Sequence, residues 1–161
     1  MAKFSWHTSA VPAALPVRQV YGFLFAPDGR VLLRVDGTKN SLPGGRPEPG
    51  ESAYVDVLRR ETFEEVTLDI GEPHYLGYQL VDDGHTPYAQ VRMVAKIRAV
   101  HAPEPDPDNG RTYLRLLVHP GQAGELLNWG ETGHRQSAAA ARAAVSVLGL
   151  PRDGFPAPEY L

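Results

Sequence analysis

The chain has 161 residues, the usual size of one domain, which is enough to bury a core without metal or disulfide crosslinks. It carries 16 lysines and arginines against 19 aspartates and glutamates, and the net charge of −3 argues against a broad electrostatic clamp on nucleic acid. The absence of cysteine excludes disulfides, thiolate metal sites and a cysteine nucleophile. No apolar run approaches the roughly 18 residues that cross a bilayer, and the first residues do not resemble a signal peptide. We therefore expect a single cytoplasmic domain over residues 1–161, without membrane or nucleic-acid partners.

The first third of the chain predicts strands and loops. Residues 1–16 form an N-terminal extension, expected to be either a loose terminus or a cover on a neighbouring subunit in a homodimer. Val17 to Phe25 is rich in β-branched and aromatic residues and predicts a strand. A Pro27-Asp28-Gly29 turn separates it from Val31 to Val35, so the two segments predict a β-hairpin. Residues 36–50, rich in glycine and proline, predict a loop.

Helices and strands alternate in the rest of the predicted structure. A helix is expected over residues 53–66 with Ser52 as its N-cap, and the alanine-rich residues 137–148 predict the strongest helix. The remaining expected elements are strands over 74–81, 89–100 and 112–118 and a short helix over 122–129. Strands interspersed with a few helices indicate a mixed α/β or α+β sandwich.

The helix predicted over residues 53–66 carries an acidic face. Glu61, Glu64 and Glu65 are spaced i, i+3 and i+4, so their carboxylates lie side by side and repel one another. A divalent cation would neutralise this repulsion, and carboxylate oxygens are the ligands that Mg²⁺ or Mn²⁺ prefers. For the helix taken alone, the alternative is a solvated acidic face with arginines as counter-charges.

The loop before this helix favours the metal site. Gly44, Gly45 and Gly50 permit tight turns and let backbone carbonyls approach a metal or a substrate closely. Taken alone, a loop rich in glycine and proline is more often a simple turn. A glycine loop that leads directly into an acidic helix is much rarer by chance than either feature.

Residues 44–68 resemble the signature of the Nudix hydrolases, Gx5Ex7REUxEExGU, in which U is an aliphatic residue. The matching positions are Gly45, Glu51, Arg60, Glu61, Glu64, Glu65 and Leu68. The resemblance is specific because spacing, charge and residue type are fixed over the whole segment, which we call the Nudix box.

The resemblance implies an α+β fold of the Nudix type, an α/β/α sandwich with a mixed sheet and an acidic catalytic helix. It implies a pyrophosphohydrolase that acts on acid anhydrides in phosphorus-containing compounds, with Mg²⁺, or Mn²⁺, as cofactor. The implied substrate is nucleotide-like, a nucleoside diphosphate linked to another moiety. The alternative is a catalytically weak Nudix-fold module that binds or senses nucleotides.

The resemblance also implies roles for the acidic side chains. The implied metal ligands are the carboxylates of Glu61, Glu64 and Glu65 and the carbonyl of Gly44. Metals held there would neutralise phosphate oxygens, position a water molecule and lower its pKa. Either Glu61 or Glu64 is expected to accept the proton of that water.

Further residues are expected to support this set. Arg60 is expected to orient the glutamates through salt bridges, and Glu51 to support this network. Nudix proteins often take one more acid from a loop beyond the box, where this chain has Glu104, Asp106 and Asp108. We select Asp108, because the Asn109-Gly110 turn that follows could direct it inward; a solvated turn is the alternative.

The spacing of the box departs from the family pattern at one place. Eight residues separate Glu51 from Arg60, where the pattern has seven. We expect the extra residue to form a bulge within 52–54, ahead of the helix; an unbroken i→i−4 ladder that starts at or before Tyr54 would contradict this. A π-bulge inside the helix is the alternative.

Two residue types in the box also depart from the pattern. Thr62 stands at an aliphatic position and is expected to pack its methyl group in the core. Thr67 stands where a glycine often ends the helix. Because a β-branched residue resists positive φ, we expect the helix to end elsewhere, nearer Gly71.

Basic and aromatic residues outside the box leave alternatives open. The strand over 89–100 has a basic face formed by Arg92, Lys96 and Arg98. This face is expected to be a solvent-facing stripe, with contact to phosphates as the alternative. Three aromatic residues are candidates either for stacking on a base or for core packing: Tyr78, Tyr88 and Trp129.

Overall fold

The computed structural model describes residues 1–161 and contains three helices and ten strands. The helices are α1 (Tyr54–Val66), α2 (Pro120–Leu127) and α3 (Gly130–Ser146). The longer strands are β1 (Lys3–His7), β2 (Val17–Phe25), β3 (Val31–Asp36), β7 (His74–Asp82), β8 (Tyr88–Val100) and β9 (Leu114–Val118). The short strands are β4 (Lys39–Ser41), β5 (Gly44–Gly45), β6 (Leu68–Ile70) and β10 (Glu159–Tyr160). None of the helices combines the length and apolar character that a membrane span requires.

The main path of the sheet follows the order β1-β7-β8-β2-β3-β9-β10. β2 runs parallel to β8, whereas β7 runs antiparallel to β8, so the sheet is mixed as predicted. The short strands β4, β5 and β6 pair with β3, β2 and β8 respectively, beside this path.

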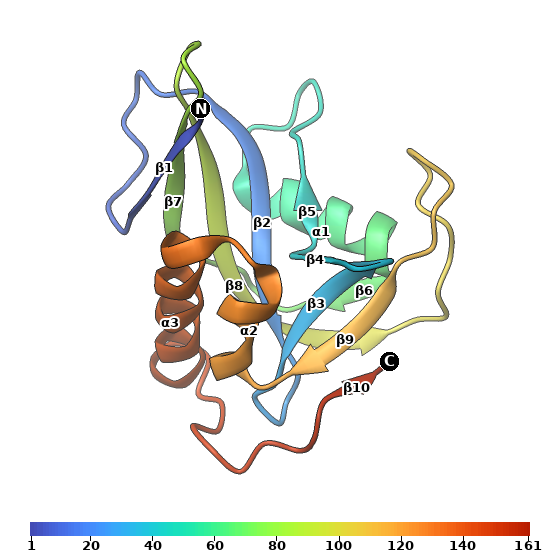
Figure 1. The fold of residues 1–161 in the computed structure, drawn as a ribbon. Helices are drawn as coiled ribbons and strands as arrows, with labels where there is room; N and C mark the ends of the chain where they lie inside the picture. The colour runs from blue at the N-terminus through green and yellow to red at the C-terminus, as the bar shows by residue number, and fades with distance from the viewer.

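Both faces of the central strands are buried. Val91 and Met93 of β8 belong to a core that includes Leu58 of α1. Val94 of the same strand belongs to a second core, which includes Ala140 of α3. Because neighbouring strand residues point to opposite faces, β8 contributes to both cores. Figure 1 shows α1 on one side of the sheet and α2 with α3 on the other, so the predicted α/β/α sandwich is confirmed.

The N-terminal extension is part of the sheet. Residues 3–7 form β1, which pairs antiparallel with β7 at the edge of the sheet, with Ser5 opposite Leu80. A Cβ atom on Gly77 would lie 2.7 Å from Cη2 of Trp6, so the indole ring packs directly on the backbone of β7. The expectation of a loose terminus is therefore wrong for these residues, because backbone hydrogen bonds and the packing of Trp6 fix them.

The predicted hairpin is confined to the turn. β2 and β3 pair only between Phe25 and Val31, and β3 pairs mainly with β9. The side of β2 away from β8 is occupied farther along by β5, through Val20 and Tyr21. The segment expected as a loop over 36–50 thus contains β4 and β5, because their backbone groups complete the edges of β3 and β2.

The bounds of all three helices differ from the predicted ones. Helix α3 begins at Gly130, seven residues before the predicted start at 137, and α2 covers 120–127 rather than 122–129. Ser52 is not the N-cap of α1: the cap is Ala53, and no side chain bonds to the free backbone N–H groups there.

The basic stripe predicted on β8 is only partly exposed. Lys96 and Arg98 are exposed, but Arg92 is 2% exposed. Nε of Arg92 donates to Oε1 of Gln136 at 2.8 Å, so α3 covers this part of the strand. The expectation of a solvent-facing position is therefore wrong for Arg92.

Candidate active site

Helix α1 is α-helical without interruption from Tyr54 to Val66. Its first i→i−4 bond joins the N–H of Val57 to the carbonyl of Ala53 at 3.4 Å. Because the ladder starts at or before Tyr54, the expected bulge within 52–54 is wrong, and so is the alternative of a π-bulge inside the helix. The extra residue instead lengthens the irregular segment 51–53, where Ala53 has extended φ and ψ of −93° and 129°.

Burial fixes the rotation of α1 about its axis. Leu58, Thr62 and Val66 are 0%, 0% and 2% exposed, so they share the core-facing side. The threonine packs in the core as expected. Burial of a leucine of this kind contributes roughly 1.5–3 kcal/mol to folding, so the helix register depends on these contacts and not on the preceding loop.

The helix ends at the position that the family pattern gives to glycine. Thr67 adopts left-handed φ and ψ of 51° and 47°, and its N–H donates to the carbonyl of Phe63. Our expectation that the helix would end nearer Gly71 is wrong. Nη1 of Arg115 donates to Oγ1 of Thr67 at 3.2 Å, and the N–H of His101 donates to its carbonyl at 3.0 Å. These contacts hold a conformation that a β-branched residue rarely adopts.

Two glycines let the loop before α1 approach its neighbours closely. Gly44 has φ of 149°, and a Cβ atom there would collide with the carbonyl oxygen of Val20. A Cβ atom on Gly45 would lie 2.5 Å from Oε1 of Glu61. The glycines thus place the loop backbone in direct contact with β2 on one side and with the Glu61 carboxylate on the other.

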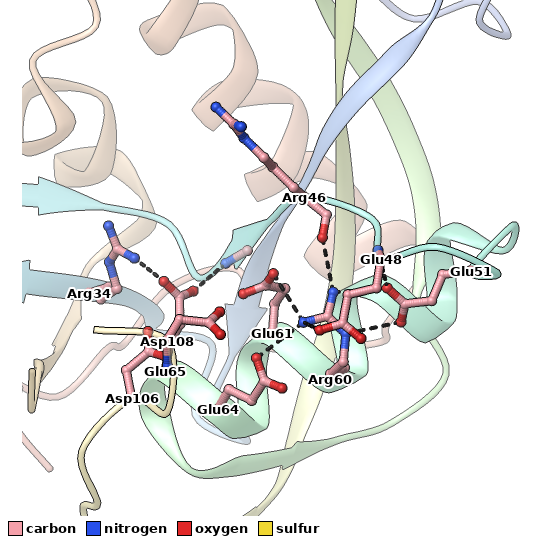
Figure 2. Close-up of polar contacts among 11 residues, drawn as sticks. Arg34, Arg46, Glu48, Glu51, Arg60, Glu61, Glu64, Glu65, Asp106 and Asp108 are labelled. Atoms are coloured by element: carbon pink, nitrogen blue, oxygen red, sulfur yellow. Dashed lines mark hydrogen bonds and ion pairs between the residues drawn. The ribbon is translucent and has the colours of Figure 1, made fainter. Parts of the chain in front are cut away.

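Arg60 is the centre of an ion-pair network, shown in Figure 2. Its Nη2 donates to Oε1 of Glu51 at 2.8 Å, and its Nη1 lies 3.2 Å from Oε1 of Glu61 and 3.1 Å from Oε2 of Glu64. Nη2 also donates to the carbonyl of Arg46 at 2.9 Å. The expected pairing of Arg60 with the glutamates is therefore present, and Glu51 still reaches Arg60 despite the extra residue. Arg60 holds the pKa of Glu51 below its usual range through these hydrogen bonds.

Glu61, Glu64 and Asp108 form a compact acidic cluster. One carboxylate oxygen from each lies within 4.8 Å of the others. Burial raises the pKa values of Glu61 and Glu64, and the nearby charge of Asp108 adds to the increase, whereas Arg60 opposes it. A cation in this place would relieve both the repulsion and the unfavourable burial.

Asp106 holds the loop that carries Asp108. It is 4% exposed, and its Oδ1 accepts from the N–H of Asp108 at 2.9 Å. Its carbonyl accepts from the N–H of Gly110 at 2.7 Å, which closes the turn. Nη1 of Arg111 then ties the loop to Asp36 of β3 at 2.6 Å. Of the three loop acids, the structure brings Asp108 to the glutamates, buries Asp106 and leaves Glu104 exposed.

Glu65 makes different contacts from the other two glutamates. Its Oε1 accepts from the N–H of Gly44 at 2.7 Å, and its Oε2 pairs with Nη1 of Arg34 (Figure 2). The Arg34 guanidinium in turn lies 4.4 Å from the ring centroid of Tyr113. Burial raises the pKa of Glu65 to about 7, although Arg34 and the Gly44 N–H oppose the increase. Of the expected metal set, Glu61 and Glu64 therefore cluster with Asp108, and Glu65 connects the glycine loop to β3.

Sequence reasoning missed Arg34, and it named Asp106 only as an alternative to Asp108. A charged residue inside the apolar segment VLLRV was the available signal for Arg34. Asp106 lies two residues before Asp108. At this spacing an aspartate carboxylate commonly accepts a hydrogen bond from the backbone N–H of the later residue. Of the aromatic candidates, Tyr78 is a core residue, Tyr88 lies beneath the Arg18 guanidinium, and Trp129 lines a cavity described below.

Comparison with known proteins agrees with this geometry. The family profile described as NUDIX domain matches residues 15–140. The chain matches no curated protein sequence. Among solved structures it is similar to a UDP-X diphosphatase, with 19% identity, a TM-score of 0.60, and coverage of 83% of this chain and 64% of the other.

Two further structures share the fold. A MutT protein from Bacillus halodurans has 19% identity and a TM-score of 0.57, over 74% of this chain and 78% of the other. A variant of the Bacillus subtilis pyrophosphohydrolase BsRppH has 20% identity and a TM-score of 0.55, over 62% of each chain, so this match spans less than two thirds of that relative. Together, the profile match, the Nudix box and the sandwich architecture show that the chain belongs to the Nudix hydrolase family.

Proposed function

We propose that this chain is a divalent-metal-dependent pyrophosphohydrolase, with a nucleoside diphosphate linked to another moiety as substrate. The observation that carries the proposal is the acidic cluster of Glu61, Glu64 and Asp108, whose oxygens lie within 4.8 Å of one another on the Nudix box and the loop beyond it. A solvated acidic face does not need a third carboxylate from a separate loop.

The chemistry of the cluster suits Mg²⁺ or Mn²⁺, since all of its donor atoms are carboxylate oxygens. Glu61, Glu64 and Asp108 would hold the ion, and Glu65 with the carbonyl of Gly44 would complete the set that the family resemblance implies. A bound ion would neutralise phosphate oxygens and lower the pKa of a water molecule.

The protein side chains have separate roles in the proposed reaction. Water attacks one phosphorus, the bond from that phosphorus to the bridging oxygen breaks, and Glu61 or Glu64 accepts the proton of the water. Both glutamates belong to the acidic cluster, so either carboxylate would lie beside the ion and the water that it activates. Arg60 holds both carboxylates in place, and Glu51 holds Arg60.

The alternative function, a catalytically weak nucleotide-binding module, was motivated by the extra residue and by Thr67. Glu51 nevertheless pairs with Arg60, and Thr67 ends the helix where a glycine would. These contacts favour the enzyme. A single domain over residues 1–161, a cytoplasmic location and a homodimer remain predictions that accompany the proposal.

The test is a panel of nucleoside diphosphate derivatives incubated with Mg²⁺, with Mn²⁺ or with a chelator, and scored for mononucleotide or phosphate release. We expect metal-dependent turnover of at least one compound, and its loss in Glu64→Gln. The matched control is Glu125→Gln, an exposed glutamate of α2, which should retain wild-type turnover. Turnover that persists in the chelator, or in Glu64→Gln, would contradict the metal assignment; saturable binding without turnover would support the sensor.

A further inference from the structure

A cavity of about 440 Å³ lies between the sheet and the start of α3. Its wall includes Tyr21 of β2, Lys39 of β4, Arg92 of β8 and Trp129. Tyr21 links the cavity to the candidate active site, because it pairs with Gly44, whose N–H binds Glu65. A substrate with its diphosphate at the acidic cluster would therefore pass Tyr21 to reach this cavity.

Arg92 has an unusual environment for a cation. It is 2% exposed, and its guanidinium carbon lies 5.0 Å from the ring centroid of Tyr21 and 5.1 Å from that of Trp129. Nε donates to Gln136 at 2.8 Å and Nη2 to Gln90 at 3.3 Å, both to neutral amide oxygens. Nη1 is buried and has no hydrogen-bond partner.

No carboxylate compensates this charge. Arg92 takes part in none of the ion pairs of the protein, which include those of Arg30, Arg34, Arg59, Arg60 and Arg111. A buried charge without a counter-ion is costly. Burial lowers the pKa of Arg92 to about 10, although Tyr21 opposes the decrease, so the side chain stays protonated at neutral pH. The two glutamines satisfy hydrogen bonds, but a neutral amide does not neutralise the cation.

The one other charged residue on the cavity wall is also a cation. Lys39 is exposed at the wall, and no aspartate or glutamate lines the cavity. Its other polar lining groups are neutral and include Gln79 and Thr132. In a chain with net charge −3, an acid-free cavity with two cations favours an anionic ligand.

We infer that the moiety joined to the nucleoside diphosphate carries an anionic group, a carboxylate or a phosphate, which Arg92 and Lys39 bind in this cavity. The inference rests on the proposed function for the diphosphate end of the substrate. Nη1 of Arg92 supplies a donor without a partner, and the anion supplies the missing counter-charge. Charge-assisted hydrogen bonds of this kind are stronger than neutral ones.

Matched substrate pairs test the inference. One pair is UDP-glucuronate and UDP-glucose, which differ by a carboxylate; the other is a nucleoside diphosphate joined to a sugar or to the phosphate of that sugar. We expect kcat/KM to favour the anionic member of one pair by about tenfold or more, and the pair that shows the preference identifies the anion. A wild-type ratio near one in both pairs would overturn the inference.

Variants test whether the cavity residues cause this preference for the anionic substrate. Arg92→Gln and Lys39→Ala should each reduce the ratio of kcat/KM values toward one, whereas Lys96→Ala, an exposed lysine on the strand of Arg92, should keep the wild-type ratio. If Arg92→Gln does not fold, Lys39→Ala decides, because Lys39 is exposed and its loss leaves no cavity in the core. An unchanged ratio in Lys39→Ala would show that Lys39 does not bind the anionic group.

A binding experiment separates this inference from the proposed function. If no compound of the panel is hydrolysed, inorganic phosphate is titrated into metal-free protein that carries Trp6→Phe, so that Trp129 is the only tryptophan. We expect a saturable change in Trp129 emission that weakens at least several-fold in Lys39→Ala and stays unchanged in Lys96→Ala. That result would retain the anion site while the hydrolase proposal fails. Without a saturable change, the anion site is overturned as well.

Discussion

Gly45 lies directly against the carboxylate of Glu61. A Cβ atom on this glycine would lie 2.5 Å from Oε1 and 2.6 Å from Cδ of Glu61, so the carboxylate occupies the space of the missing side chain. Glu61 is also held by Arg60 at 3.2 Å and belongs to the acidic cluster. Gly45, the glycine that opens the family pattern, is therefore required sterically by a side chain sixteen residues later in the sequence.

Gly45→Ala is predicted to displace the Glu61 carboxylate and to reduce hydrolysis by about 10²-fold or more, since small misplacements of catalytic groups have effects of that size. The melting temperature should change little, because the glutamate can move toward the solvent-facing side of the site. The control is Gly121→Ala in α2, where a Cβ atom would meet nothing within 4 Å. Wild-type turnover in Gly45→Ala would show that the contact has no functional role.

Mg²⁺ or Mn²⁺ should raise the melting temperature of the wild type, because the ion binds the assembled acidic cluster and not the unfolded chain. Glu64→Gln and Asp108→Asn should each lose most of this shift and most of the hydrolytic activity. Without metal, either variant should unfold within about 0.5 kcal/mol of the wild type. A repulsive charge is gone in both, and Glu64→Gln also loses the ion pair with Arg60, which offsets this gain. Differential scanning calorimetry with and without metal measures both effects; an equal shift in Asp108→Asn would place the ion elsewhere.

Glu65 should make the stability of the metal-free protein depend on pH. Its pKa is raised from an ordinary 4.5 to about 7, so between these values the folded chain binds more protons than the unfolded chain. The free energy of unfolding should therefore fall as pH rises from about 4.5 to 7, by about 1–3 kcal/mol from this residue. Glu65→Gln should flatten this dependence, leaving the smaller contributions of Glu61 and Glu64, which have the same sign.

Urea denaturation at a series of pH values in the presence of a chelator measures this dependence. Glu125→Gln, which alters an exposed glutamate, should retain the wild-type slope. A slope in Glu65→Gln equal to that of the wild type would mean that Glu65 is not the group that titrates in this interval.

At position 67, glycine should give a more stable protein than alanine, which is the reverse of their usual order in a helix. Its φ of 51° is unfavourable for any residue with a Cβ atom, so Thr67→Gly should be more stable than Thr67→Ala by about 1–2 kcal/mol. Both variants lose the hydroxyl that Arg115 binds, so their difference isolates the backbone conformation. At exposed Ala138 in α3, replacement by glycine should instead destabilise by about 1 kcal/mol. An alanine variant at 67 that equals the glycine variant would contradict the left-handed conformation.

The sequence alone determined the parts of this protein that depend on local geometry. The i, i+3 and i+4 spacing places Glu61 and Glu64 on one face of any α-helix, and the burial of Leu58, Thr62 and Val66 follows from the same period. The strands of the central sheet follow from runs of β-branched and aromatic residues, and the family follows from the fixed spacing of the box.

Tertiary contacts decided the rest, because they join residues that are distant in the sequence. The N–H of Asp108 bonds to the buried Asp106, and only the path of the loop over α1 brings Asp108 to Glu64. Thr67 adopts a left-handed conformation against its own preference, because Arg115 and the backbone of His101 bind it there.

Arg92 shows most clearly what the sequence alone does not determine. On an isolated strand, alternation places its guanidinium on a polar face beside Lys96 and Arg98, and no local rule distinguishes the three residues. The position of α3 distinguishes them: Gln136 covers Arg92, and Trp129 lies over its guanidinium, whereas Lys96 and Arg98 stay exposed. Sequence period determines which face of a strand a side chain occupies, but whether that face is buried depends on which helix packs against it.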